Sequence, residues 1–157
     1  MRLPSFLFGD TFDALHKFES LEINEKSIVF YAENKSSMNH FKSLIFELTD
    51  NMNLHICYVT SVKDDPMLSL QNNKIQSFYI GDGSARTKFF LTLKSRILIM
   101  DMPDLGQFHI KRSKVYPVHY IYLFHSMFSV HSYLRKGAID HYDTIFCVGP
   151  HHINEIR

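Results

Sequence analysis

The histidine best placed for acid–base chemistry is His125, which follows the apolar run VHYIYLF. A histidine at the end of a buried strand can act as a general base, because imidazole titrates near neutral pH. A histidine that bonds the backbone of the next loop is the alternative interpretation. Ser126 follows directly, and His131, Arg135 and Lys136 come shortly after. These cations can gather round an anionic group, or they can be ordinary charges on a helix surface.

A second group of polar residues lies in the segment 101–113, directly after the apolar run ILIM. The segment offers an acid, an amide, an imidazole and two cations, namely Asp104, Gln107, His109, Lys111 and Arg112. If ILIM is a strand of a doubly wound sheet, the loop after it lies where such sheets place their sites. We therefore expect these residues to bind substrate, with a solvated surface loop as the alternative.

The run GDGS at residues 81–84 follows one apolar segment and precedes a helical pattern. Glycines allow a tight turn there, and the amino end of a helix favours an anion. Arg86 and Lys88, in the first turn of the expected helix, can face a phosphate. The run lacks the GxGxxG spacing of a dinucleotide fingerprint, so a plain strand-to-helix turn is the alternative.

The ten histidines do not form a recognisable metal-binding pattern. His151 and His152 are adjacent, and neighbours on a helix point in different directions. No HExxH run is present among the others. We therefore predict no metal site and no cofactor.

Apolar segments alternate with helical patterns along the chain, and these elements must position the polar groups. Strands are expected over residues 27–31, 54–60, 75–80, 96–100, 118–124 and 144–148, and helices over 38–51, 84–94, within 127–140 and from 151. This alternation predicts an α/β fold with a mainly parallel, Rossmann-like doubly wound sheet. The sites of such folds lie at the carboxyl ends of the strands.

The composition is that of an ordinary globular domain. The chain has 157 residues, of which 45% are hydrophobic and 21% charged, which excludes intrinsic disorder. Seventeen Lys and Arg against sixteen Asp and Glu give a net charge of +1, so bulk charge does not favour nucleic-acid binding. No run is long enough to span a bilayer. Cys57 and Cys147 lie in apolar runs without a CxxC motif, which indicates free cysteines in a reducing compartment.

Residues 1–25 are expected to form an N-terminal extension that contains a short amphipathic helix. Phe6, Leu7, Phe12, Leu15 and Phe18 lie roughly on one side of that helix. We expect this side to pack against the domain, and peripheral contact with a membrane interface is the alternative.

Five stretches carry a resemblance to a known family: SIVFYAENKSSMNHFKSLIFEL (27–48), YVTSVKDDP (58–66), FYIGDGSARTKFFLTLKSRILIMDMPDLGQFHIKRS (78–113), PVHYIYLFHSMFSVHSYLRKGAIDHYDTIFCVGPHH (117–152) and NEIR (154–157). They resemble the N-terminal part of the CDP-glycerol glycerophosphotransferases, which are the teichoic-acid-type polymerases and primases and their relatives in capsule synthesis. The resemblance covers about Lys26 to Arg157. The family's histidine in a Trp-His-Gly-Thr context corresponds to His125, which stands here in Phe-His-Ser.

The resemblance implies a GT-B fold of two Rossmann-like domains, of which residues 26–157 are the acceptor-side one. It implies transfer of glycerol phosphate from CDP-glycerol to a polyol-phosphate or glycan acceptor, which can be lipid-linked, with release of CMP. His125 would be the general base, and Arg86, Lys111, Arg112 and Arg135 would face anionic groups. The donor would be held mainly by a C-terminal domain beyond this chain, so the fragment alone would be inactive. The implied location is the cytoplasm, at the inner face of the cell membrane.

Two other functions remain open. A GT-B sugar transferase or epimerase that uses a nucleotide sugar would share the fold and the cleft without the phosphoryl chemistry. A Rossmann-like binding module would have no catalytic activity.

Overall fold

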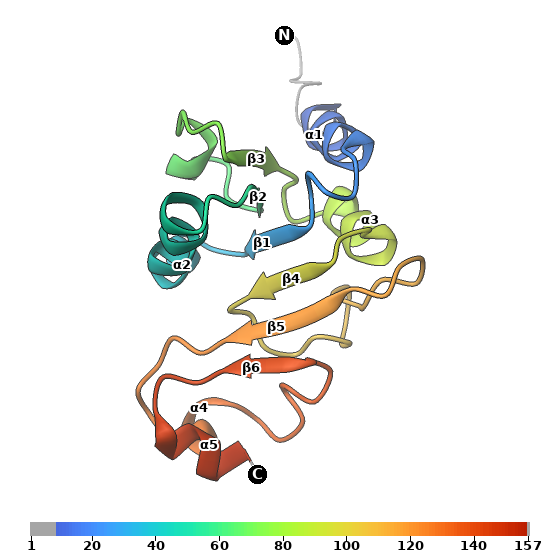
Figure 1. Cartoon of the computed structure of the whole chain (residues 1–157). Coiled ribbons are helices and arrows are strands. Elements are labelled where there is room, and N and C mark those ends of the chain that lie inside the picture. Colours follow the sequence, from blue (N-terminus) through green and yellow to red (C-terminus); the bar gives the residue numbers. More distant parts are fainter. Residues whose placement is uncertain (1–8, 157) are drawn as a thin grey trace, which may run out of the picture.

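The computed structural model describes residues 9–156 and contains one six-stranded sheet (Figure 1). Every pair of neighbouring strands is parallel, and the strand order is β3-β2-β1-β4-β5-β6. The strands are β1 (Ile28–Ala32), β2 (Ile56–Thr60), β3 (Ile75–Tyr79), β4 (Ile97–Met100), β5 (His119–Leu123) and β6 (Thr144–Phe146). This architecture confirms the predicted α/β, Rossmann-like doubly wound fold.

The sheet has apolar cores on both faces, which explains the continuous apolar runs of the central strands. The helices α1 (Gly9–Ser20) and α3 (Ser84–Thr92) cover one face, where Phe18, Phe89 and Phe90 pack against the strands. On the other face α2 (Ser37–Phe46) packs Phe41 and Ile45 against the sheet. A π-helical turn, Glu47–Asn51, extends α2 over the rest of the predicted helix.

The chain after β5 contains the two helices that the sequence predicts, both of them short. Within 127–140 only α4 (Val130–Tyr133) is helical, because Leu134 is extended and Gly137 has a positive φ of 82°. The final helix, α5 (Pro150–Ile156), begins at a proline, which suits the first turn of a helix. A short 3-10 helix, Pro66–Leu68, follows Asp65, whose side chain accepts a hydrogen bond from the Met67 amide.

The helix α1 belongs to the core of the domain. Leu15 and Phe18 are fully buried against α3 and β3. Lys26 Nζ donates hydrogen bonds to the carbonyls of Phe18 and Glu19, which places a cation at the carboxyl end of α1. Leu15 and Phe18 are therefore not available for membrane contact. Phe6 and Leu7 lie outside the described residues.

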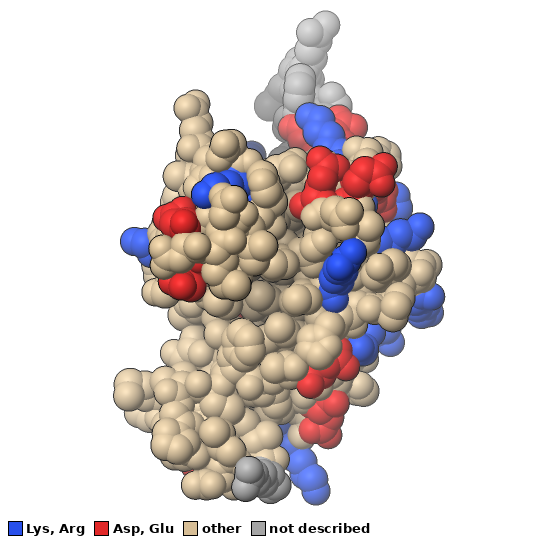
Figure 2. Space-filling model, viewed as in Figure 1, with Lys and Arg blue, Asp and Glu red and all other residues tan. Residues whose placement is uncertain are grey.

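No helix within residues 9–156 has the length and apolarity that a bilayer span requires. Cys57 and Cys147 are both free, as the sequence predicts. On the face drawn in Figure 2, Lys and Arg side chains are interspersed with Asp and Glu, and the lower part of the view carries few charges.

The strand order reverses between β1 and β4, which are neighbours in the sheet. The chain leaves β1 toward β2 and β3, whereas β4 leads toward β5 and β6. In open parallel sheets, ligands bind outside the carboxyl ends of the strands at this switch point. The residues that follow β1, β4 and β5 are therefore the first candidates for a site.

Candidate functional site

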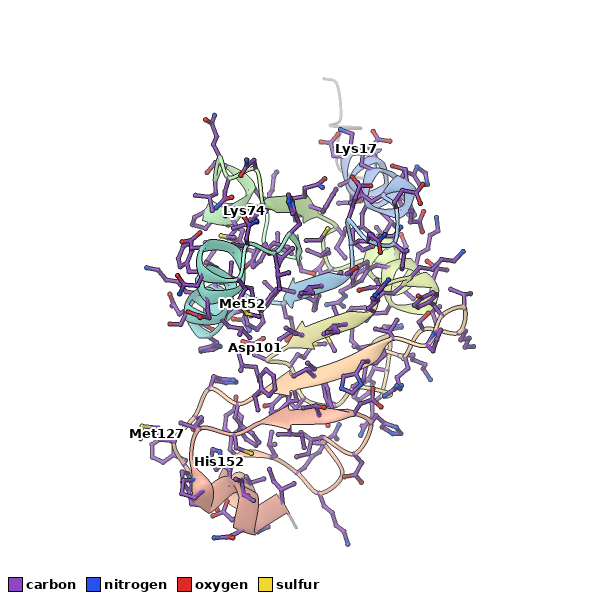
Figure 3. The ribbon with its side chains drawn as sticks, in the orientation of Figure 1. Lys17, Met52, Lys74, Asp101, Met127 and His152 are labelled. Carbon is purple, nitrogen blue, oxygen red and sulfur yellow. The ribbon has the colours of Figure 1, made fainter. Side chains whose placement is uncertain are left out.

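The carboxylate of Asp101 lies at the switch point, directly after β4 (Figure 3). The residue is 5% exposed. Ser37 Oγ, at the start of α2, donates a hydrogen bond to Asp101 Oδ1 at 3.1 Å, and His40 Nδ1 lies 2.6 Å from Oδ2. Residues after β1 and β4 are thus joined through one buried carboxylate, which fixes the orientation of the His40 ring.

His125 completes the cluster from the carboxyl end of β5. Its ring stacks on the ring of His40, with the centroids 4.1 Å apart and the planes inclined by 14°. Its Nε2 is 2.8 Å from the hydroxyl of Tyr133 on α4, whereas Nδ1 is buried without a hydrogen-bond partner in the structure. We refer to His40, Asp101 and His125 as the histidine–aspartate cluster.

The surroundings of His125 favour its neutral form. Burial lowers the pKa of this imidazole, and a positive charge on the neighbouring His40 would lower it further. The carboxylate of Asp101 and the backbone at Leu123 oppose the shift without cancelling it. A neutral imidazole at pH 7 can accept a proton, so the cluster is suited to general base catalysis.

The cluster also has the composition of a metal-binding set. One donor atom from each of its three residues lies within 4.8 Å of the others. Two imidazoles and one carboxylate suit Zn²⁺ and other divalent transition metals. The sequence-based prediction of no metal site rested on the spacing of other histidines and did not consider this set, because His40 and Asp101 are far apart along the chain and only the fold brings them together.

On the face of the sheet that α3 covers, a pocket of about 320 Å³ lies between α3 and the segment 102–110, and its lining includes the apolar side chains of Met102, Pro103 and Ile110. Arg86 and Glu33 line it from one side, and Asp104, Gln107, Phe108 and His109 line it from the other. Arg86 Nε is buried and has no hydrogen-bond partner in the structure. Burial raises the pKa of the Glu33 carboxyl, the Arg86 guanidinium opposes that rise, and Asp101 adds to it.

The segment 102–110 is held tightly from outside the pocket. Arg135 Nε donates to Asp104 Oδ1 at 2.9 Å, and its NH2 group donates to Gln107 Oε1 at 2.6 Å. The Asp104 amide donates to the Ala138 carbonyl at 2.7 Å. Arg135, predicted to contact an anion, is therefore bound to protein groups in this structure.

The structure brings most of the predicted site residues to the carboxyl ends of the strands. His125 and Ser126 lie after β5, and Arg86, Asp104, Gln107 and His109 line the pocket beside α3. Ser126 Oγ accepts a hydrogen bond from the Phe128 amide at 3.2 Å. His131 is exposed on α4, and Lys111 is also exposed.

Arg112 lies at the amino ends of β5 and β6, whereas the histidine–aspartate cluster lies at the carboxyl ends of the strands. It donates to the carbonyls of His141 and Val118 and to Asp143 Oδ2, and its guanidinium lies over the ring of Tyr120. Val118 and Asp143 immediately precede β5 and β6. The prediction that Arg112 binds substrate is not supported by this placement, because these contacts occupy it at the amino ends of the strands.

Three residues of the site are absent from the sequence-based set: His40, Asp101 and Glu33. Asp101 and Glu33 each follow a strand directly, so their position after an apolar run was a usable signal. His40 lies inside an amphipathic helical pattern, where a histidine is indistinguishable from a surface residue. Only the pairing of β1 with β4 brings α2 beside Asp101.

Comparison with protein-family models, curated proteins and solved structures gives no match for this chain.

Proposed function

We propose that this chain is the acceptor-side domain of a CDP-glycerol glycerophosphotransferase with GT-B architecture. The observation that carries the proposal is the histidine–aspartate cluster at the switch point of a Rossmann-like sheet. The sequence resemblance supplies the donor, and the geometry supports a base at the position of His125. The acceptor would be a hydroxyl of a cell-surface polymer, teichoic-acid-like or capsule-like. The acceptor can be lipid-linked, at the inner face of the membrane.

The proposed reaction uses His125 Nε2 as the proton acceptor. An acceptor hydroxyl takes the place of the Tyr133 hydroxyl and donates its hydrogen bond to Nε2. As the hydroxyl oxygen attacks the phosphorus that bears glycerol, its proton moves to His125. The new P–O bond forms while the bond to the CMP oxygen breaks, and CMP leaves. General base catalysis of this kind contributes about 10²- to 10⁴-fold to the rate.

Asp101 and His40 act as positioning residues in this proposal. Asp101 fixes the His40 ring through its 2.6 Å contact with Nδ1, and that ring supports one face of the His125 imidazole. The negative charge of Asp101 also stabilises the imidazolium that forms on His125 during the reaction. The cations that stabilise the transferred phosphoryl group would come mainly from the donor-side domain.

The test is CMP release from CDP-glycerol by the complete natural protein that contains this chain. In His125→Ala we expect the rate to fall by about 10²-fold or more. His119→Ala is the matched control, because His119 lies at the opposite end of β5 and bonds Thr144. We expect this control to retain the wild-type rate.

Three outcomes would overturn the proposal. Undiminished CMP release in His125→Ala would remove the base assignment. Turnover of UDP-sugars instead of CDP-glycerol would favour a nucleotide-sugar transferase or epimerase. Binding of a ligand without turnover of either donor would favour a non-catalytic module.

A further inference from the structure

Asp101 is a buried carboxylate without a permanent counter-charge. No Lys or Arg within residues 9–156 forms an ion pair with it, although the residue is almost fully buried. Its two oxygens contact the neutral hydroxyl of Ser37 and the ring of His40, which is charged only when protonated. Buried charges in proteins are paired with an opposite charge or coordinate a metal ion. A bound cation would supply the counter-charge that Asp101 lacks.

The donor atoms of the histidine–aspartate cluster have the spacing that a metal ion requires. A tetrahedral ion with bonds of about 2.0 Å holds neighbouring donor atoms about 3.3 Å apart. In the cluster, His40 Nδ1 and Asp101 Oδ2 are 2.6 Å apart, and the three donor atoms all lie within 4.8 Å of one another. The required separation falls between these two values. Two imidazoles also select Zn²⁺ over Mg²⁺ or Ca²⁺, which prefer oxygen ligands.

The stacked rings indicate which group moves when an ion binds. A metal ion lies in the plane of an imidazole that ligates it, because the nitrogen lone pair lies in that plane. The ring planes of His40 and His125 are inclined by only 14°, so both rings cannot point at one ion in this arrangement. The His40 ring is fixed by the buried carboxylate, whereas Nε2 of His125 contacts the exposed hydroxyl of Tyr133. Ion binding would therefore rotate the His125 ring out of the stack.

We propose that His40, Asp101 and His125 form a binding site for one divalent transition-metal ion, for which Zn²⁺ is the best match. Each residue contributes one donor atom, and water takes the fourth position. This site goes beyond the proposed function, which uses His125 as a base. A neutral imidazole bound to a metal has no free lone pair to accept a proton, so the ion would inhibit CMP release. The inhibition rests on the proposed function, but the binding does not.

The test is equilibrium dialysis of the full-length protein against Zn²⁺, with the bound zinc counted per chain. Loss of a group that only supports a ligand weakens metal affinity about 10- to 100-fold, so loss of the ligand in His40→Ala should weaken it about 100-fold or more. Asp101→Asn keeps the size of the side chain and should also weaken binding, which guards against a folding defect in His40→Ala. Zn²⁺ should raise the melting temperature of the wild type and not that of either variant.

His151→Ala is the matched control. His151 and His131 lie near Glu155 on α4 and α5, and they form the competing set of surface ligands. This control should bind Zn²⁺ as the wild type does. The proposal is overturned if the wild type binds no zinc, if His40→Ala and Asp101→Asn bind it with wild-type affinity, or if only His151→Ala loses it.

Zn²⁺ binding is measured without CDP-glycerol, so the two proposals can fail separately. A protein that binds Zn²⁺ at the cluster without turning over CDP-glycerol would contradict the proposed function and support the metal site. A protein that releases CMP and binds no zinc would contradict the metal site alone.

Discussion

The rings of His40 and His125 are stacked 4.1 Å apart although they come from opposite sides of the switch point in the strand order. His40 lies on the helix that follows β1, and His125 follows β5. Burial lowers the pKa of His125, and a positive charge on His40 at this distance would lower it further. The stacking therefore favours the neutral form of His125 at neutral pH.

Removing His40 should raise the pKa of His125. Burial is the main cause of its lowered pKa and the charge of His40 is the second, and His40→Ala reduces both. The acid limb of the pH–rate profile for CMP release should then move to higher pH, because a base must be neutral to act. NMR titration of the His125 ring measures the pKa directly. His131→Ala, on exposed α4, is the control, and an unchanged or lower His125 pKa in His40→Ala would contradict the assignment.

The lowered pKa of His125 also predicts a pH dependence of stability. The unfolded chain has the ordinary pKa of about 6.5, so it binds more protons than the folded chain below that pH. The contribution of His125 is present above the unfolded pKa and is lost as the pH falls through the folded pKa. In His125→Gln, the urea midpoint should fall less between about pH 7 and pH 5 than in the wild type. If the urea midpoints of the two proteins fall equally between these pH values, this linkage is excluded.

Loss of the buried carboxylate should destabilise the domain. In Asp101→Ala, Ser37 Oγ and His40 Nδ1 lose the acceptor to which they bond. We expect the free energy of unfolding to fall by about 1–3 kcal/mol. Asp64→Ala removes a carboxylate that pairs with Lys35 on the surface, where both side chains are well exposed. This control should change stability by less than about 1 kcal/mol in urea titrations, and equal effects would show that Asp101 has no special role.

The loop around Phe108 should depend on Gly106. Gly106→Ala adds a Cβ that clashes with His141 at a φ of 93°, where alanine is also strained. Thermal unfolding should show that the free energy of unfolding falls by about 1–3 kcal/mol. The double variant with His141→Ala should recover part of that loss, because only the backbone strain remains. A double variant as unstable as the single one would mean that the ring contact contributes nothing.

Arg112 should matter for stability and not for turnover. In Arg112→Gln, the carbonyls of His141 and Val118 and the Asp143 carboxylate lose their charged donor. Partial burial raises the pKa of Asp143, but its hydrogen bonds to Arg112 and the Tyr120 amide hold that pKa below the ordinary value. The stabilisation from the Arg112–Asp143 pair is therefore lost as the pH falls through the folded pKa of Asp143. The difference in stability between Arg112→Gln and the wild type should accordingly be smaller in acid. We expect a lowered melting temperature with unchanged CMP release. An unchanged melting temperature with reduced CMP release would instead support a role of Arg112 in substrate binding.

The sequence was sufficient for the fold because local patterns and tertiary packing agree in this chain. The runs that become β1, β4 and β5 are apolar on both faces, as buried parallel strands must be. The helix predicted within 127–140 is the short α4, which does not extend further because Arg135 and the following residues contact the segment 102–110 in a non-helical conformation.

The site was only partly predictable, because some of its residues are far apart in the sequence and meet only in the fold. His125 and Asp104 follow strands, and their position is visible in the sequence. The contact between His40 and Asp101 depends on strand pairing across the switch point, which no local pattern encodes. The balanced charges of Arg86 and Arg135 also depend on partners that are remote in sequence.

The central position of β1 has a consequence for the order in which the domain assembles. β1, β2 and β3 can pair as the first half of the chain emerges, whereas the second edge of β1 must wait for β4. Such late, non-local pairings slow folding. His40 belongs to the early half, and Asp101 and His125 belong to the late half. The cluster therefore exists only when both halves have docked, so a chain arrested after β3 would lack it.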